Sequence, residues 1–271
     1  MIESNKWLQQ ELKKIQSWET DQSDLWFWEK LGRLPFKLID KVTPSFIQNK
    51  LGSILDELGQ YIQTGGNYLS PASSLSSYYP EDSIHTIEEA SVLPIEKMDK
   101  AVEKLTKMRK KVATVQGAST GIGGLFTISI DIPILLGLQL KTLQDIALCY
   151  GYDPQDKKER IFIVKCLQFV SADIVGKQAI LKQLSGIDNN QNTKREVLSE
   201  IQGWREVVFS YRDQFGWKKL FQMVPIAGFI FGAFTNRSAV NDIAEAGMML
   251  YRKRRITERL SKDILDGTNK V

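Results

Sequence analysis

Apolar side chains recur along most of this chain at the three- and four-residue spacing of an amphipathic α-helix. Leu8, Leu12, Ile15 and Trp18 share one helical face, and Ser4 precedes them as a candidate cap for the first turn. The chain contains no run of alternating apolar and polar residues separated by turn dipeptides, which is the pattern of β-strands. The sequence therefore predicts an all-α protein.

Further helices are predicted where the same spacing lies between capping or breaking residues. Thr43-Pro44 begins a helix that Gly65-Gly66 ends, since proline suits the first turn and glycine the residue after the last turn. The remaining predicted helices run from Pro94 to about Lys111, from Asp153-Pro154 to about Leu184, over residues 194–215 and, as an amphipathic helix, over residues 241–265.

A Ser- and Pro-rich segment over residues 64–83 interrupts the helical pattern and carries almost no charge, as linkers do. We therefore predict three parts: a Trp-rich helical segment over residues 1–66 that packs on the core, a linker over residues 67–83, and a main helical domain over residues 84–271.

Two uncharged, glycine-rich stretches stand out within the main domain. Residues 112–140 contain Asp131 as their only charge, and residues 220–235 contain none. Asp131-Ile132-Pro133 should end one helix and begin the next, because the residue before proline is pushed out of the α region. We expect a multi-helix bundle around two apolar hairpins, near residues 112–150 and 217–240, the first of them made of helices over about 112–130 and 134–150.

Neither stretch matches a single membrane span, which needs about 20 predominantly apolar residues. The second stretch has 16 uncharged residues and contains Pro225, and Asp131 would sit where a span is driest. Cations flank both ends of each stretch, which argues against one crossing. A hairpin in a protein core or a shallow re-entrant insertion fits better.

The cations of the chain are clustered beside these stretches and at residues 157–160. A net charge of +4 is too small to indicate a nucleic-acid-binding protein. Clusters beside apolar helices favour attraction to an anionic lipid surface. The candidate membrane-surface residues are Lys107, Arg109, Lys110, Lys111, Lys218, Lys219, Arg252, Lys253, Arg254 and Arg255.

Small residues recur in both stretches at a four-residue spacing that lets helix backbones approach closely. A lone carboxylate such as Asp131 must pair, cap a helix or titrate upward in an apolar setting, and Asn236 is a natural partner for it. The candidate functional or helix-packing residues are Gly117, Gly121, Gly123, Gly124, Asp131, Pro133, Pro225, Gly228 and Asn236.

Metal and disulfide chemistry has little support in the composition. Cys149 and Cys166 are the two cysteines, without a CxxC spacing, and His85 is the sole histidine. We therefore expect neither a disulfide scaffold nor a zinc site, and no cofactor. The first residues lack the apolar core of a signal peptide, so we expect an intracellular protein.

Residues 111–124 match two enzyme motifs in their letters. The glycines resemble the phosphate-binding turn of a short-chain dehydrogenase, but no Tyr-xxx-Lys pair follows and no strand precedes them. Residues 117–121 also match the G-x-S-x-G nucleophile elbow, although His85 precedes Ser119 in the chain. A hydrolase that uses Ser119 or Asp131 is therefore the enzymatic alternative.

A family resemblance rests on residues spread over nearly the whole chain. They are Trp18-Glu19, Gly117, Gly121, Gly123-Gly124, Asp131-Ile132-Pro133, Tyr150-Gly151, Pro225-Ile226-Ala227-Gly228, Asn236, Ala246 and Tyr251-Arg252. In these residues the chain resembles the EcsC family, bacterial proteins encoded beside or related to an ABC-transporter operon. The resemblance implies no catalytic residues.

Together these patterns predict an accessory or interaction module at the inner face of the cytoplasmic membrane, associated peripherally or by shallow insertion. Its partner would be the membrane surface or a membrane complex such as a transporter. A wholly soluble helical scaffold is the remaining alternative.

Overall fold

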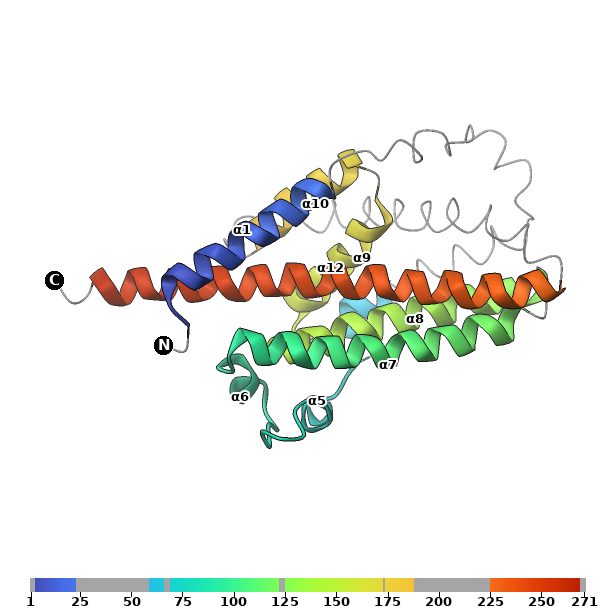
Figure 1. The fold of residues 1–271 in the computed structure, drawn as a ribbon, viewed down its shortest axis with the longest axis horizontal. Helices are drawn as coiled ribbons and strands as arrows, with labels where there is room; N and C mark the ends of the chain where they lie inside the picture. Colours follow the sequence, from blue (N-terminus) through green and yellow to red (C-terminus); the bar gives the residue numbers. More distant parts are fainter. Residues whose placement is uncertain are drawn as a thin grey trace.

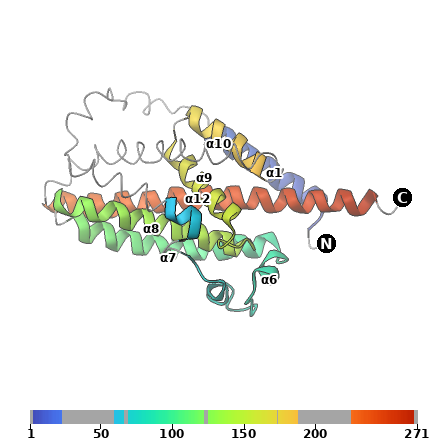
Figure 2. The same ribbon diagram turned by 180° about the vertical axis from the view of Figure 1, so that it is seen from behind.

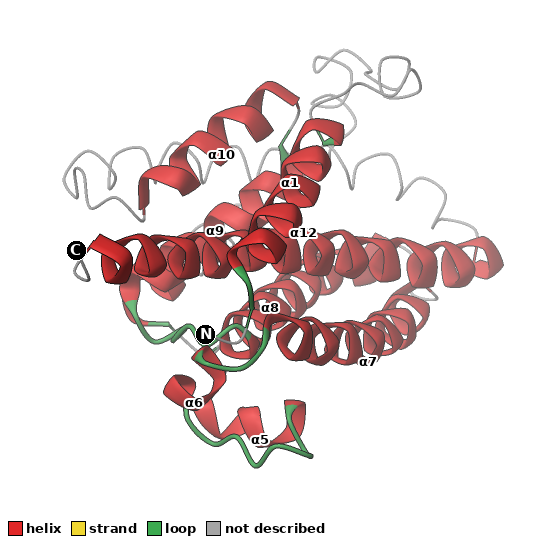
Figure 3. Ribbon diagram, turned by 60° about the vertical axis from the view of Figure 1, so that its left-hand side comes forward, coloured by secondary structure: helices red, strands yellow, loops and turns green. Residues whose placement is uncertain are grey.

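The computed structural model describes residues 3–22, 59–65, 69–121, 125–172, 174–187 and 225–268. These residues form helices and contain no strand, so the all-α prediction is confirmed (Figure 3). The elements are α1 (Asn5–Asp21), the 3₁₀-helix η2 (Ala72–Ser74), α5 (Leu75–Tyr78), α6 (Ile87–Ser91), α7 (Ile95–Gly121), α8 (Leu125–Cys149), α9 (Lys157–Ser171), α10 (Ile174–Ile187) and α12 (Pro225–Thr268).

Three long helices form the frame of the molecule. α7 and α8 run antiparallel beside each other, and α12 packs along both of them (Figures 1 and 2). With 44 residues, α12 extends well beyond its two neighbours at its C-terminal end. α1 and α9 pack on α12 as well, and α10 packs on α9.

The first helix begins as the capping pattern predicts. The Ser4 hydroxyl oxygen accepts a hydrogen bond from the main-chain N–H of Trp7 at 3.3 Å, which satisfies one donor of the first turn. Leu8 and Ile15 on the predicted apolar face are fully buried. The indole N–H of Trp18 donates to Glu245 on α12 at 2.8 Å, so the face that the sequence marks as apolar is the face that docks.

Gly65 also behaves as predicted. Residues 59–64 are helical, and Gly65 follows them with φ of +82°, the left-handed conformation that glycine adopts at the end of a helix. The rest of the predicted helix that begins at Thr43-Pro44 lies outside the described residues, as do residues 194–215.

The predicted break at Asp131–Pro133 is wrong, because α8 runs unbroken from Leu125 to Cys149 through that tripeptide. A proline inside a helix removes one main-chain hydrogen bond. Here α8 packs against α7 and α12, and such tertiary packing supplies most of the stability of a helix in a protein. The described part of α7 ends at Gly121, before residues 122–124, which carry Gly123 and Gly124 and lie outside the description.

The single helix predicted from Asp153-Pro154 to about Leu184 is also wrong. Asp153 and Pro154 form a turn in which the Asp153 carboxylate accepts from the N–H of Gln155 at 2.8 Å, and α9 begins three residues later behind the N-cap Asp156. A second interruption at the extended residue Ala172 separates α9 from α10. The first difference arises because aspartate stabilises turns as well as helix starts.

The second apolar stretch joins the predicted C-terminal helix from Pro225 onward, so α12 is longer than the 241–265 expected. A hairpin turn near 217–240 would therefore precede Pro225, outside the described residues, together with Lys218 and Lys219. The division of the chain into three parts stays a prediction. Within the predicted linker, Leu75 and Tyr79 are buried among core residues.

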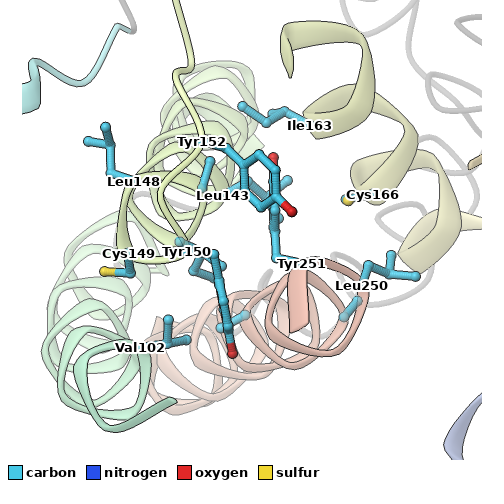
Figure 4. Close-up of a cluster of buried hydrophobic side chains, with 14 of the residues drawn as sticks. Val102, Leu143, Leu148, Cys149, Tyr150, Tyr152, Ile163, Cys166, Leu250 and Tyr251 are labelled. Atoms are coloured by element: carbon cyan, nitrogen blue, oxygen red, sulfur yellow. The ribbon is translucent and has the colours of Figure 1, made fainter. Parts of the chain in front are cut away.

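A cluster of buried side chains lies where the end of α8 meets α9 and α12 (Figure 4). Tyr251 is fully buried there, with its ring 4.8 Å from that of Phe162 and stacked on that of Tyr150 at 6.4 Å. Both cysteines are buried and free. Gly247 lets α12 approach α8, since a Cβ at this position would lie 2.7 Å from Leu143 Cδ2.

Candidate functional site

The C-terminal end of α8 is built around Tyr150 and Gly151. α8 ends at Cys149, and Gly151 has φ of +74°. A Cβ at Gly151 would lie 2.4 Å from the Cα of Ser91, the last residue of α6. Only glycine combines the left-handed backbone with this close approach, so the Tyr150-Gly151 pair has a structural explanation.

Arg255 of α12 caps this helix end. Its Nε donates to the Tyr150 carbonyl at 3.0 Å, and its Nη2 donates to the carbonyl of Gly151 at 3.2 Å. The side chain is buried, with an exposed fraction of 7% for the residue. A cation is favourable here because the unpaired carbonyls at a helix C-terminus carry partial negative charge.

The other cations of the tail also bind within the protein. Arg252 bridges Asp99 at 2.9 Å and Glu11 at 2.7 Å, which joins α12 to α7 and α1. Further along α12, Lys253 pairs with Glu19 at 2.7 Å and Arg254 with Glu159 at 2.7 Å. These contacts turn the predicted cluster 252–255 toward protein carboxylates and carbonyls. The cluster is therefore left out of the membrane surface that we propose below.

Two buried carboxyl groups at this junction are shifted toward the neutral form. Burial raises the pKa of Glu159 above its ordinary value, although Arg254 and the Tyr251 hydroxyl both stabilise its charge. Burial likewise raises the pKa of Asp99, despite hydrogen bonds from Tyr150 and Arg252. Each carboxyl group accepts hydrogen bonds from a tyrosine hydroxyl and from an arginine, and these bonds link neighbouring helices.

A second buried polar cluster surrounds Asp145 on α8, and the sequence reading missed it. The Ser70 hydroxyl donates to Asp145 at 2.7 Å, and Arg109 of α7 pairs with the same carboxylate. Lys141 donates to the Ser70 hydroxyl oxygen at 2.7 Å. The available signal was an aspartate at a core position of an apolar helix, which requires a partner.

This cluster contains a Ser–Lys contact of the kind found in some hydrolases. Ser70, however, is fully buried, its hydroxyl proton is directed at Asp145, and its main-chain N–H donates to Gln144 at 2.8 Å. The arrangement fixes the segment before η2 onto α8.

The apolar stretches meet at the opposite end of the frame from the α12 C-terminus. The Gly121 end of α7, the Leu125 end of α8 and the Pro225 end of α12 lie together there in both views (Figures 1 and 2). In sequence, residues 112–121, 125–140 and 225–236 carry Asp131 as their single charge. The tertiary structure thus brings residues 225–236 beside residues 112–121 and 125–140, and these three segments with a single charge form one end of the molecule, here called the apolar end.

The predicted cluster 107–111 lies on α7 beside the apolar end and divides into two kinds of side chain. Lys107 and Lys111 are exposed. Arg109 is turned toward Asp145, and Lys110 donates to Asn241 of α12 at 2.8 Å. On α12, Arg237 is also exposed, and it follows the uncharged residues 225–236 directly.

The predicted helix-packing residues are distributed over the same three helices. Gly117 is buried on α7, and Asn236 is buried on α12 with an exposed fraction of 1%. Gly121 ends α7. Asp131, Pro133, Pro225 and Gly228 lie within α8 and α12, where the surroundings of their side chains are outside the description.

Comparison with known proteins identifies the family. The EcsC protein family matches residues 9–256 of the chain. The chain belongs to the EcsC protein family. Among curated proteins of Bacillus subtilis (strain 168), it is 57% identical over 259 residues to "Uncharacterized protein YdbA", covering 94% of this chain and 95% of that one. It is 28% identical over 171 residues to "Protein EcsC", covering 63% of this chain and 69% of that one. No solved structure matches.

In this EcsC-family chain residues 111–121, which carry the whole G-x-S-x-G motif and the first part of the dehydrogenase-like motif, lie inside α7. Residues 117–121 form the last turns of α7, whereas a nucleophile elbow and a dinucleotide-binding turn both follow a strand. Ser119 is exposed, and its hydroxyl donates to the main-chain carbonyl of Gln116 at 2.8 Å. His85 precedes α6, and α6 lies near the N-terminal end of α7, whereas Ser119 is in the last turns of α7 (Figure 1).

The described part of the EcsC-family chain contains neither a metal-binding group of side chains nor a membrane-crossing helix. No group of three or more His, Cys, Asp or Glu side chains there is arranged to hold a metal ion. Among the same residues, no helix combines the length and the apolar character that a membrane crossing needs.

Proposed function

We propose that this EcsC-family protein is an accessory module that binds the inner face of the cytoplasmic membrane peripherally and serves a transporter or another membrane complex there. The observation that carries the proposal is the apolar end, where helix segments of α7, α8 and α12 with Asp131 as their single charge meet beside exposed cations. An end of this composition suits shallow contact with lipid more than a purely aqueous surface.

The charge distribution supports the same orientation. Lys107, Lys111 and Arg237 border the apolar end, and residues 112–121 and 225–241 contain no acidic side chain. Each cation held near an anionic membrane surface contributes about 1 kcal/mol. With the apolar end at the membrane, these cations would reach the headgroups. Glu11 and Glu19 of α1, and Glu3 just before it, are paired with the α12 cations Arg252, Lys253 and Arg259.

Membrane fractionation at native expression level tests the proposal. We expect the protein in the membrane pellet, with release by a high-salt wash if headgroup attraction dominates, because salt screens exposed charge contacts. Retention through alkaline carbonate would instead indicate insertion of the apolar end. A protein found in the soluble fraction alone would contradict the proposal.

Co-sedimentation of the purified chain with vesicles separates lipid binding from binding to a membrane complex. Vesicles of phosphatidylcholine with phosphatidylglycerol should bind the chain, and phosphatidylcholine alone should bind it less. Pellet association in cells without binding to either vesicle would leave the membrane complex as the receptor and would contradict direct lipid contact.

A further inference from the structure

One face of α7 exposes a stripe of apolar side chains. Met108, Val112 and Val115 have exposed fractions of 49%, 46% and 70%. Their spacing of four and three residues places them on one side of the helix. Three large apolar side chains are therefore open to solvent in a row about 10 Å long. The row runs along the helix axis into the apolar end.

Lysines line the same side of the helix. Lys104 and Lys111 fall within the stripe at the same four- and three-residue spacing, and Lys107 lies one position beside it; all three are exposed. Glu103 is the exposed acidic residue on this part of α7. The face thus has three lysines, three apolar side chains and a net positive charge.

We infer that this α7 face lies flat on an anionic lipid bilayer, with Met108, Val112 and Val115 entering the boundary between headgroups and acyl chains. This inference rests on the proposed membrane function and names the surface and the lipid class. Lys104, Lys107 and Lys111 contact the phosphates, because a long aliphatic stem lets an ammonium group reach a headgroup while the stem stays in an apolar layer. Basic residues alternating with apolar ones on one helix face are typical of helices in the membrane interface.

The charge of the face distinguishes lipid from the other occupants. A second copy of this chain, docked face to face, would bring two sets of three lysines together and would repel. An acidic protein partner would satisfy the lysines, and vesicles without protein separate that case from lipid.

The test compares two triple variants with equal loss of charge. Lys104→Gln, Lys107→Gln and Lys111→Gln together should weaken binding to vesicles of phosphatidylcholine with phosphatidylglycerol about 100-fold. The control changes Lys6, Lys13 and Lys262 to glutamine; these lysines are exposed on α1 and on the distal part of α12, and the control should bind like the parent chain. Equal weakening by both triple variants would show that net charge alone matters and would overturn the inference.

A second pair of variants tests the apolar side chains of the stripe. Val115→Asp should weaken binding roughly tenfold or more, since a carboxylate resists entry into the lipid boundary. Val92→Asp changes an equally open valine, 65% exposed, outside the stripe and should leave binding unchanged. Each variant's helical circular dichroism and melting temperature establish that it folds.

A depth measurement completes the test. Both native cysteines are buried, so Val115→Cys can be labelled selectively with an environment-sensitive fluorophore. We expect a blue shift when vesicles are added, and no shift for the same label at Val92→Cys. If the parent chain binds vesicles while the lysine and Val115 variants bind equally well and the label does not shift, the α7 inference is wrong and the proposed function stands. If the parent chain binds no vesicles, the α7 inference is wrong, and membrane fractionation decides whether a membrane complex still holds the protein there.

Discussion

The guanidinium group of Arg255 holds the main-chain carbonyl of Tyr150, with Nε 3.0 Å from the carbonyl oxygen. The hydroxyl of that same Tyr150 donates to Asp99 of α7, which Arg252 also binds. The end of α8 is therefore tied to α12 through its backbone and to α7 through its side chain. Three members of the family resemblance, Tyr150, Gly151 and Arg252, meet at this junction, where their contacts hold the long helices in register.

Replacing Arg255 with lysine should destabilise the fold by about 2–4 kcal/mol. The lysine ammonium group has all its donors on one nitrogen and lacks the planar fork whose Nε and Nη2 reach the Tyr150 and Gly151 carbonyls, so a buried acceptor loses its partner. Urea unfolding followed by circular dichroism measures the loss. Arg237→Lys, at an exposed position, should change stability by no more than about 0.5 kcal/mol. Equal stability of the two variants would mean that the α8 cap contributes little.

Gly151→Ala should cost more than about 2 kcal/mol, because alanine must adopt the left-handed backbone and its Cβ would lie 2.4 Å from the Cα of Ser91. Gly59→Ala is the matched control. Gly59 lies in a helical turn with nothing within 4 Å of an added Cβ, so alanine there should stabilise the fold by about 0.5–1 kcal/mol. Thermal melts of both variants give the comparison, and a harmless Gly151→Ala would refute the close packing of α6 on α8.

Arg109 and Lys107 belong to one predicted cluster, yet their replacement should change the stability of the fold by different amounts. Arg109 pairs with the fully buried Asp145, so Arg109→Gln leaves a buried carboxylate short of a partner and should destabilise the fold by about 2–4 kcal/mol. Lys107→Gln, two residues earlier at the surface, should leave stability within about 0.5 kcal/mol of the parent. Chemical denaturation decides this, and similar losses for both would show that the Asp145 pair is weak.

The pH dependence of stability should reveal the buried carboxyl group of Glu159. Its pKa in the folded protein is raised by burial. As pH increases above 4.5, the unfolded chain loses this proton first, so the folded state loses stability until pH passes the folded pKa. Glu159→Gln has no proton to lose. The stability of the parent relative to this variant should therefore fall as pH rises from about 4.5, in denaturation curves measured at a series of pH values.

The stability that Glu11 contributes should change with pH in the opposite direction in the same experiment. Burial alone would raise its pKa, but Lys14 and Arg252 outweigh burial and the pKa is lowered overall. Its stabilising contribution is therefore present above the ordinary glutamate value and is lost as pH falls through the folded pKa. The parent should gain stability relative to Glu11→Gln as pH rises toward that ordinary value. The same slope for both variants would contradict the assigned environments.

Ser119 offers a direct check on the hydrolase alternative. Its hydroxyl donates to a main-chain carbonyl inside α7, and a serine activated as a nucleophile instead donates to a base. We expect a fluorophosphonate probe to label the parent chain and Ser119→Ala equally, at background level. Labelling of the parent that disappears in the variant would establish a reactive serine and revive the enzymatic interpretation.

Features that depend on a few neighbouring residues could be read from the sequence. The Ser4 cap, the apolar face of α1 and the Gly65 stop were predicted correctly, because a cap, a helical face and a left-handed glycine are local arrangements. The break expected at Pro133 was wrong because a proline restricts the local backbone, whereas the packing of α8 on α7 and α12 maintains the helix over its length.

The partners of the charged residues could not be read in this way. Residues 252–255 have the composition of a surface cluster, yet Arg252 binds Glu11, which lies 241 positions away in the chain, and Arg255 binds carbonyls at the end of α8. A charge run has the same sequence whether it faces solvent or carboxylates, since its pairing depends on which helices the fold brings alongside it. Asp145 was missed for the same reason, because Ser70 and Arg109 reach it from distant segments.

The sequence by itself determined the helical class, the two uncharged stretches and the family, because periodicity, composition and residue order are properties of the chain. The tertiary structure alone decided that the uncharged stretches share one end of the molecule, and that Lys104, Lys107 and Lys111 are exposed while Arg109 and Arg255 are held inside. The physical reason is that burial and ion pairing are set by the neighbours of a side chain in space, and long helices bring together residues that are far apart in sequence.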